Sequence, residues 1–204
     1  MTNIGEIDWE HLDAGKPSMT ITLDAVTADE VTCWARVMLE PGAAVILDTE
    51  TVGSDTETKV RPTPACEIAV IDACTGQTLI STLINPKTPI SKKAFTLHRI
   101  SDADIANAPT WPEVLLEVLR VTAGRKILAY YSDFDLGVIR LDSDRYHLDP
   151  GHLGDEANWD CVMTRRSEWL RTRKWHRLGG GHRALGDCLR TRDVLIGLTA
   201  SPRR

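Results

Sequence analysis

Acidic residues stand where apolar segments end, and they are the first candidates for chemistry in this 204-residue chain. Asp48 and Glu50 follow the apolar run 43–47. In an extended strand, residues i and i+2 point to the same face and lie roughly 6.6 Å apart along the chain, so both carboxylates can project from one strand end. Two such groups can share a hard divalent cation. A solvated strand end is the competing interpretation, and the pair alone does not decide between them.

Asp135 adds a third carboxylate after a second apolar segment. It follows the sequence KILAYY at 126–131, which we expect to form another strand. If that strand is central or parallel to the first, its end brings Asp135 beside the first acidic pair. Aspartate is also favoured at helix starts. We assign that capping role to Asp133, expect Phe134 to pack inward, and expect Asp135 to point at the site.

The third candidate segment is GGGHRALGD, which contains His182 and Asp187. Residues five apart on a regular helix differ by about 140° after one full turn, so both side chains could not face one site if both were helical. The glycines at 179–181 give a flexible approach, which lets His182 sit at the helix entrance and Asp187 one turn in. A single histidine is more often an ordinary surface or core residue. Its position on a glycine hinge, five residues before an aspartate, favours a role in the site.

The elements that must position these residues follow from hydrophobic periodicity. We expect a helix at 27–39, with Thr27 as N-cap and Glu30 completing a capping box; strands at 43–50, 66–73 and 77–85; a helix at 111–122; a strand at 126–131; and helices at 133–146, 161–173 and 184–200. The short turn at Thr75-Gly76 predicts an antiparallel hairpin. This order of elements predicts the α/β class, with a mixed β-sheet flanked by α-helices.

The three acidic segments, in this order and spacing, resemble the exonuclease motifs of the DEDDh (DnaQ-like) 3′-5′ exonuclease family. The matching segments are LDTET at 47–51, SDFD at 132–135 and HRALGD at 182–187. The similarity covers residues 42–200 and implies a ribonuclease H-like fold. It also implies that the chain removes nucleotides from the 3′ end of DNA or RNA with two divalent metal ions, Mg²⁺ or Mn²⁺.

The resemblance also assigns roles to single residues. It makes metal ligands of Asp48, Glu50, Asp135 and Asp187, and a general base of His182, so that all five would be catalytic. Carboxylate and water ligands suit Mg²⁺ or Mn²⁺, and two such ions about 3.5–4 Å apart can clamp the attacking water and the leaving 3′ oxygen. Four crowded carboxylates would repel one another without cations. A neutral imidazole can accept a proton near neutral pH.

Three further residues are candidates for substrate binding: Thr51 in the first motif, Tyr131 before the second and Arg183 inside the third. Tyr131 stands where many relatives have asparagine in the stretch Tyr-Asn-Ala-x-Phe-Asp, so a polar contact is altered there. Its ring either stacks on a base or packs against the protein. We interpret His98, in a segment that also looks like the family, as structural.

Two charged segments accompany the motifs. The basic run 165–183 interleaves arginine and lysine with Trp169 and Trp175. It is either the phosphate-facing wall of the cleft or a solvated helix face with two core tryptophans. The polar segment 52–65 is interpreted as a mobile loop over the site. Its acidic triplet, 55–57, has no apolar strand before it and is expected to be solvated.

Composition sets limits on these interpretations. An apolar content of 42% supports one core, so we expect an N-terminal extension with one helix at 1–41 and a catalytic domain at 42–204. The net charge of -5 argues against a general nucleic-acid coating protein, but not against an enzyme that holds a few nucleotides. Five cysteines without a CxxC pair suit a reducing compartment. With no apolar run near the roughly 18 residues of a membrane span and no leader-like N-terminus, we expect a soluble, cytoplasmic protein without membrane contacts.

The leading hypothesis is a free-standing 3′-5′ exonuclease that acts on single-stranded DNA ends and releases nucleoside 5′-monophosphates. The alternatives are an RNA 3′-end trimming enzyme or a proofreading subunit attached to a polymerase; a homodimer partner also stays open. The tail LTASPRR shows no clamp-binding peptide, which disfavours the polymerase-bound form. A binding module that has lost catalysis is disfavoured by the intact set of acidic residues and histidine. DNA and RNA are not distinguished, because discrimination depends on contacts to the 2′ position.

Overall fold

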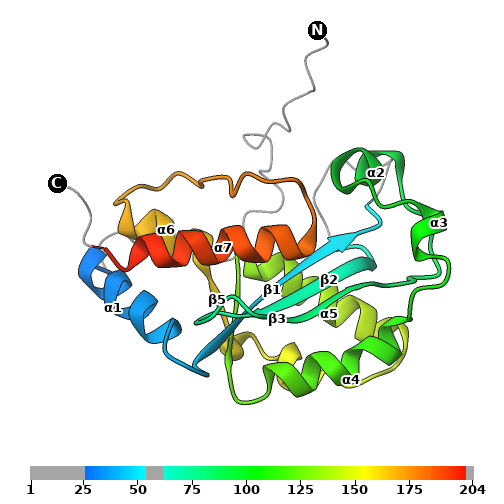
Figure 1. The fold of residues 1–204 in the computed structure, drawn as a ribbon, viewed down its shortest axis with the longest axis horizontal. Coiled ribbons are helices and arrows are strands. Elements are labelled where there is room, and N and C mark those ends of the chain that lie inside the picture. The colour runs from blue at the N-terminus through cyan, green and yellow to red at the C-terminus, as the bar shows by residue number, and fades with distance from the viewer. Residues whose placement is uncertain (1–25, 54–61, 201–204) are drawn as a thin grey trace, which may run out of the picture.

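The computed structural model describes residues 26–53 and 62–200 and forms a mixed five-stranded sheet between two helical layers (Figure 1). The strands are β1 (Ala44–Thr51), β2 (Ala65–Asp72), β3 (Thr78–Leu83), β4 (Lys126–Ala129) and β5 (Trp159–Cys161), in the order β3-β2-β1-β4-β5. The first three strands pair antiparallel, and β4 and β5 continue the sheet in parallel from β1. The predicted α/β class and the predicted hairpin are confirmed.

The described part of the chain contains seven α-helices. They are α1 (Ala28–Met38), α2 (Lys92–His98), α3 (Asp102–Ile105), α4 (Trp111–Thr122), α5 (Ser132–Arg145), α6 (Val162–Trp169) and α7 (Ala184–Leu198), with short 3₁₀ turns at Gly151–Gly154 and Glu156–Asn158. Helices α4 and α5 bury their apolar side chains on one face of the sheet, and α1, α6 and α7 cover the other. None of these helices is long and apolar enough to cross a bilayer.

Strand β1 contributes side chains to the hydrophobic cores on both faces of the sheet, which explains why it is continuously apolar. Successive side chains of a strand point to opposite faces. Val45 and Leu47 accordingly pack on the α4–α5 side, whereas Ile46 packs on the α7 side. The alternation continues to the strand end, so Asp48 and Glu50 lie on the α7 side. A strand buried on both faces thus delivers its acidic end to the surface that α7 covers.

Helix α1 belongs to the same packed body as the rest of the described chain. Its N-cap is Thr27, and Glu30 completes the predicted capping box. Val31 and Ala35 are fully buried in the core that α7 shares, and the Arg36 guanidinium donates a hydrogen bond to the carbonyl oxygen of Thr199 at 2.9 Å. The helix assigned to the N-terminal extension therefore packs on α7, while residues 1–25 lie outside the described residues. The proposed domain boundary at residue 42 stays a prediction.

Among the predicted elements that end earlier than expected, a helix and a strand show the cause of the early end. The helix expected at 161–173 stops at Trp169, because Arg171 takes a left-handed φ of 54° and the Thr172 amide bonds back to the Ser167 carbonyl oxygen at 3.0 Å. This is the Schellman ending of a helix. The strand expected at 126–131 stops at Ala129, because Tyr131 already serves as the N-cap of α5. The capping role given to Asp133 is therefore wrong: this residue lies inside the first turn of α5.

Strand β5 and helices α2 and α3 were not predicted. β5 has three residues and α3 has four, too few for a periodic pattern. Helix α2 is signalled only by its cap, since the Ser91 hydroxyl accepts a hydrogen bond from the Ala94 amide at 3.1 Å. The cysteines at 33, 66, 74, 161 and 188 are free thiols in the structure.

Candidate active site

The acidic end of β1 extends beyond its neighbour β4. Pairing with β4 ends at Ile46, whereas pairing with β2 continues to Thr51. Helix α5 reaches β1 at this point from the opposite layer. The carboxylate of Asp135 accepts hydrogen bonds from the amide and the hydroxyl of Thr49, at 3.0 and 2.8 Å. Asp135 is thereby fixed to Thr49, the residue between Asp48 and Glu50, so it lies beside the first acidic pair, as the sequence predicted.

His182 and Asp187 approach the same strand end from α7. The helix begins at Ala184 with Arg183 as N-cap, so His182 precedes it, with a φ of 47°, and Asp187 lies in the first turn. Glu50, His182 and Asp187 each present a possible ligand atom, and these atoms lie within 4.8 Å of one another. The predicted arrangement of histidine at the helix entrance and aspartate one turn in is what the structure has.

One carboxylate oxygen in this cluster is left without a donor. Within residues 26–53 and 62–200, Oδ1 of Asp187 is buried and has no hydrogen-bond partner. The glycine hinge lies directly against it, since a Cβ on Gly180 would stand 2.4 Å from this oxygen. A buried acceptor without a donor is unfavourable unless a cation or a polar group binds it.

Burial and mutual repulsion disturb the ionisation of all four acids. Burial raises the pKa of Asp48 well above its ordinary value, and the carboxylates of Asp135, Glu50 and Asp187 raise it further. Burial raises the pKa of Glu50 to about 8, again with Asp187 contributing. It raises the pKa of Asp135 to about 7, although the hydrogen bonds from Thr49 act in the opposite direction. Burial also raises the pKa of Asp187, against the effect of His182.

These features test whether divalent cations fit the residues present. The donors are oxygen-rich, as Mg²⁺ and Mn²⁺ prefer, and the pKa shifts report that the carboxylates cannot all ionise easily in the absence of positive charge. The unpartnered oxygen of Asp187 gives a cation a vacant lone pair. The residues therefore fit a divalent metal site.

Glu67 is a neighbour of the site that sequence reasoning missed. It lies on β2 directly opposite Glu50 and is 5% exposed. Its carboxylate accepts hydrogen bonds from the Arg183 guanidinium, at 2.6 Å from Nη2 and 3.0 Å from Nε, and from the Ala184 amide at 2.9 Å. It thus binds the N-terminus of α7 to the sheet. The sequence did contain a signal for this residue, because Glu67 is a charged residue inside the largely apolar strand predicted at 66–73.

Two of the predicted substrate-binding residues, Thr51 and Arg183, make contacts within the protein. Arg183 donates hydrogen bonds from Nε and Nη2 to the Glu67 carboxylate. The backbone carbonyl of Thr51 accepts a hydrogen bond from Nε2 of His98 at 3.2 Å, while Nδ1 of His98 accepts one from the Ile100 amide at 3.0 Å. These two bonds support a structural role for His98, which holds the end of β1. The contacts of Thr51, Tyr131 and Arg183 with substrate stay predictions.

The structure describes the basic run 165–183 and the two ends of the segment 52–65. Trp169 packs against the core, but Trp175 is 40% exposed, so the alternative with two core tryptophans does not hold. The loop expected at 52–65 is held at its base, where the Val52 amide bonds to the Pro64 carbonyl oxygen at 2.9 Å. The acidic triplet 55–57 lies outside the described residues.

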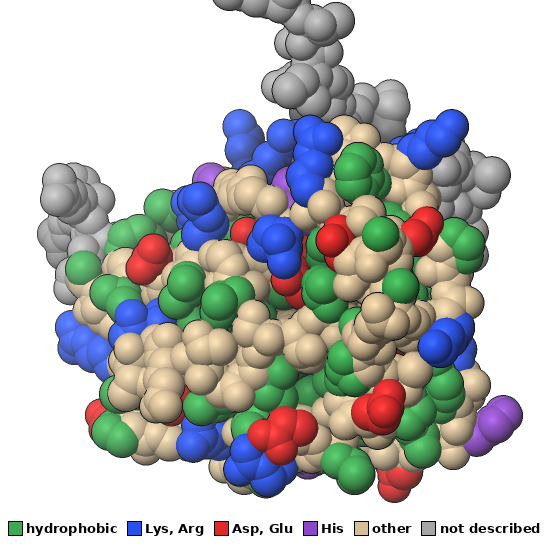
Figure 2. Space-filling view, turned by 45° about the vertical axis from the view of Figure 1, so that its right-hand side comes forward, with side chains coloured by type: hydrophobic (Ala, Val, Ile, Leu, Met, Phe, Trp, Pro, Cys, Tyr) green, Lys and Arg blue, Asp and Glu red, His purple; other side chains and the backbone are tan. Residues whose placement is uncertain are grey.

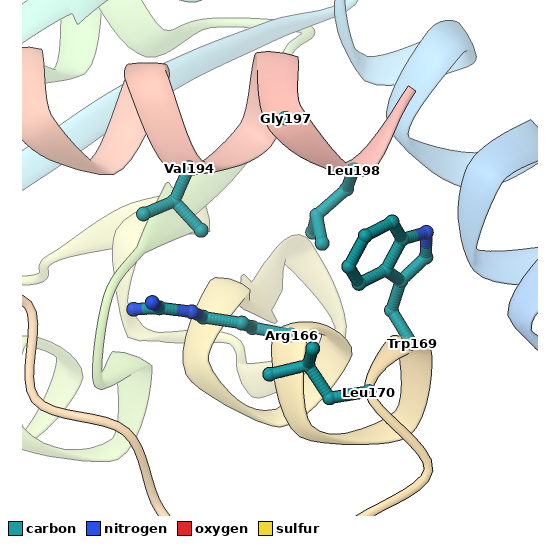
Figure 3. A pocket seen from close by; sticks show the side chains of 6 residues that line it. All are labelled: Arg166, Trp169, Leu170, Val194, Gly197 and Leu198. Atoms are coloured by element: carbon teal, nitrogen blue, oxygen red, sulfur yellow. The ribbon is translucent and has the colours of Figure 1, made fainter. Parts of the chain in front are cut away.

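A separate pocket lies between α6 and the far end of α7 (Figure 3). It is lined by Arg166, Trp169, Leu170, Val194, Gly197 and Leu198. Its α7 residues lie near the C-terminus of that helix, whereas Asp187 lies in the first turn. The pocket shares no residue with the acidic cluster, and its lining is mainly apolar.

Comparisons with known proteins are consistent across sequence and structure. The family model RNase_T, described as exonuclease, matches residues 45–195. The chain is 27% identical over 176 residues to the uncharacterized exonuclease CP81 of Escherichia phage 186, which covers 76% of this chain and 87% of that protein. It is 28% identical over 183 residues to a DNA polymerase III subunit epsilon-like protein of Rhodobacter capsulatus, which covers 80% of this chain and 25% of that protein.

Solved structures show the same fold. The nuclease domain of 3′hExo, a DEDDh family member bound to rAMP, has a TM-score of 0.54 and 15% identity, covering 81% of this chain and 96% of that one. Exonuclease I of E. coli in complex with an oligonucleotide has a TM-score of 0.56 and 14% identity, covering 75% of this chain and 40% of that one. The ribonuclease H-like architecture is confirmed.

The central strand of the mixed sheet delivers an acidic pair to the start of α7, where a histidine precedes the helix and an aspartate lies in its first turn. Together with the comparisons, this arrangement identifies the class of 3′-5′ exonucleases. The chain belongs to the RNase_T exonuclease family and is a member of its DEDDh, DnaQ-like group. It is therefore a nuclease, a hydrolase of phosphodiester bonds, and dependence on divalent metal ions is typical of this family. The predicted family, fold and enzyme class are confirmed.

Proposed function

We propose that this protein removes nucleotides one at a time from the 3′ end of single-stranded DNA and releases nucleoside 5′-monophosphates. The observation that carries the proposal is the convergence of Glu50, His182 and Asp187, whose ligand atoms lie within 4.8 Å of one another beside the acidic end of β1. This convergence supports the proposal because it would give an oxygen-rich cation site with an imidazole at its edge.

Four carboxylates would hold two Mg²⁺ or Mn²⁺ ions: those of Asp48, Glu50, Asp135 and Asp187. When bound, such cations neutralise charge on the phosphate and make a coordinated water more acidic. The protein supplies a rigid frame for them. Thr49 fixes the Asp135 carboxylate with two hydrogen bonds, and Glu67 fixes the start of α7. Each ligand is therefore held on a strand or helix rather than on a free loop.

His182 is the proposed general base. Its side chain is exposed at the entrance of α7, beside Glu50 and Asp187, so water can reach it. A neutral imidazole takes the proton from the attacking water, and the 3′ oxygen of the shortened strand leaves with the electron pair of the broken P–O bond. Asp187 lies close enough to stabilise the imidazolium that results.

Thr51, Tyr131 and Arg183 are the proposed substrate contacts, and Tyr131 can stack on the terminal base. A polymerase-bound proofreading role is a second candidate, because the relative from Rhodobacter capsulatus is named as similar to a polymerase epsilon subunit. RNA trimming uses the same chemistry at the same site. Substrate choice therefore has to be measured.

The test is a digestion panel of 3′-labelled and 5′-labelled DNA and RNA strands, with closed single-stranded circles, in Mg²⁺ or Mn²⁺. We expect mononucleotides from the 3′ end of linear DNA, intact circles, and slower attack on strands with a 3′ phosphate. An Asp48→Ala variant should lose nearly all hydrolysis and keep its fold. Faster digestion of RNA would favour the trimming function, and cutting of circles would show an endonuclease.

A further inference from the structure

The segment that joins α6 to α7 differs in charge from the rest of the molecule. We define this α6–α7 loop as residues 170–183. Its cationic residues are Arg171, Arg173, Lys174, Arg177 and Arg183, and it contains no acidic residue, although the whole chain has a net charge of -5. The loop passes along the upper edge of the molecule above α7 (Figure 1), and Lys and Arg side chains gather along that edge above a group of acidic side chains (Figure 2).

The backbone of the loop is tied to buried side chains. The hydroxyl of Ser167, a fully buried residue, donates a hydrogen bond to the Lys174 carbonyl oxygen at 2.9 Å. The hydroxyl of Tyr130, which is 8% exposed, donates one to the His176 carbonyl oxygen and accepts one from Arg166 at 2.9 Å. Tyr130 directly follows β4, so this contact holds the middle of the loop near the strand end from which α5 starts. A loop fixed in this way loses little conformational freedom on binding.

The side chains near these two anchored carbonyl groups face the solvent. Arg173, Lys174 and Trp175 are all exposed, with 40% of Trp175 accessible. Trp169, in contrast, packs against the core, and its indole N–H donates a hydrogen bond to the Ala200 carbonyl oxygen at 3.2 Å. An indole presented to water among cations is the combination that binds single strands, in which cations contact phosphates and the ring stacks on a base.

We propose that the α6–α7 loop binds the single strand on the 5′ side of the nucleotide being removed. Arg173 and Lys174 contact its phosphates, and Trp175 stacks on one of its bases. The need for such a surface follows from charge: the acidic centre and the net negative protein both repel a polyanion, and the loop supplies local attraction. The inference rests on the proposed exonuclease function, because the loop contains His182, the proposed general base.

The test compares two substrates that differ in length. A p-nitrophenyl ester of thymidine 5′-monophosphate fills only the catalytic centre, whereas a long single-stranded oligonucleotide also extends over the loop. For Trp175→Ala, the ratio of kcat/KM for the oligonucleotide to that for the ester should fall roughly 5- to 100-fold, as expected for a lost stacking contact. The loss should appear in KM. The double variant Arg173→Ser with Lys174→Ser should also weaken the salt dependence of KM. The slope of log KM against log salt concentration should fall by about 0.7 for each cation removed.

Arg120→Ala is the matched control, since it removes one exposed cation from α4, on the opposite side of the sheet. It should leave the ratio unchanged. An unchanged ratio in the loop variants, or an equal loss on both substrates, overturns the inference. Fluorescence polarisation of the oligonucleotide in EDTA measures binding without hydrolysis. If the wild type cleaves neither substrate, the proposed function fails, and weaker binding by Trp175→Ala in this assay still decides the role of the loop.

Discussion

At the scale of single residues, the site combines groups that are unfavourable when taken alone. Asp187 has a buried oxygen without a donor in the described part of the chain, and such an oxygen costs about 1–3 kcal/mol. Asp135 is a buried acid and Asp48 a half-buried one, and burial raises the pKa values of both. A divalent cation bound here would offset each of these penalties at once. The residues therefore fit a bound ion, as the proposed function requires.

The ring of His182 lies beside Glu50 and Asp187, so its position allows two roles, general base or metal ligand. As a general base it should be needed for proton transfer and not for metal binding. His182→Ala should then lower the single-turnover rate by roughly 10²- to 10⁴-fold while Mn²⁺ affinity, measured by calorimetry, stays nearly constant. Raising the pH should restore part of the rate, since hydroxide replaces the base. A collapse of Mn²⁺ affinity would instead make His182 a ligand.

At the scale of elements, the glycine hinge and α7 have to fit closely. A Cβ at Gly180 would meet the Asp187 carboxylate at 2.4 Å and Arg190 at 3.2 Å, whereas a Cβ at Gly181 would meet nothing within 4 Å. Gly180→Ala should therefore displace Asp187 or the hinge and lower kcat by about 10- to 100-fold. Gly181→Ala removes the same backbone freedom and should change kcat by less than about twofold. Equal rates in the two variants would contradict this account.

The ion pair between Glu67 and Arg183 holds α7 to β2. Glu67→Gln keeps an acceptor for the Ala184 amide but loses the charge that Arg183 contacts. Because the Arg183 side chain is 53% exposed, solvent screens part of the pair, and we expect the free energy of unfolding in urea to fall by about 1–3 kcal/mol.

The matched control for this prediction is Glu117→Gln on α4, which breaks an exposed pair with Arg120 and should cost less than about 1 kcal/mol. A double variant with Arg183→Gln should show coupling between Glu67 and Arg183. Loss of equal size in Glu67→Gln and Glu117→Gln would mean that the pair between Glu67 and Arg183 does not hold the helix.

At the scale of the whole molecule, the acidic cluster links stability to pH. Glu50 and Asp135 have pKa values raised to about 8 and about 7 in the folded protein. The unfolded chain releases these protons near pH 4, so the folded state binds more protons between about pH 4 and pH 8. Stability contributed by these groups is fully present below pH 4 and is lost as the pH rises through 7 and 8. The metal-free protein should therefore be less stable at pH 8.5 than at pH 5.5.

The measurement is the Tm in EDTA and in Mn²⁺ at several pH values between these limits. Mn²⁺ should raise Tm more at pH 8.5, where the carboxylates are ready to ionise, than at pH 5.5. A Glu50→Gln variant lacks one of the titrating groups and should show a smaller fall of Tm with pH in EDTA. A metal-free Tm that rises over this range, or an unchanged slope in the variant, would show that the cluster does not control the pH response.

The sequence alone determined the features that depend on neighbouring residues. The apolar run of β1 ends in Asp48 and Glu50, and the period of α4 gave its bounds at Trp111–Thr122. The glycine hinge predicted where His182 and Asp187 stand relative to the start of α7. Such features are encoded within one or two turns of chain, because capping, periodicity and glycine freedom act over a few residues. The motif order was then enough to indicate the family.

Only the tertiary structure decided the contacts between distant segments. Glu67 stands opposite Glu50 because of the register between β1 and β2, and Asp135 bonds to Thr49 because β4 stops short of the β1 end. The exposure of Trp175 depends on how the α6–α7 loop is tied to side chains elsewhere in the fold. Strand register and loop anchoring join residues far apart in the chain, and no local pattern specifies them. The sequence thus determined which groups are the candidates for the chemistry, and the packing of distant elements decided what holds them in place.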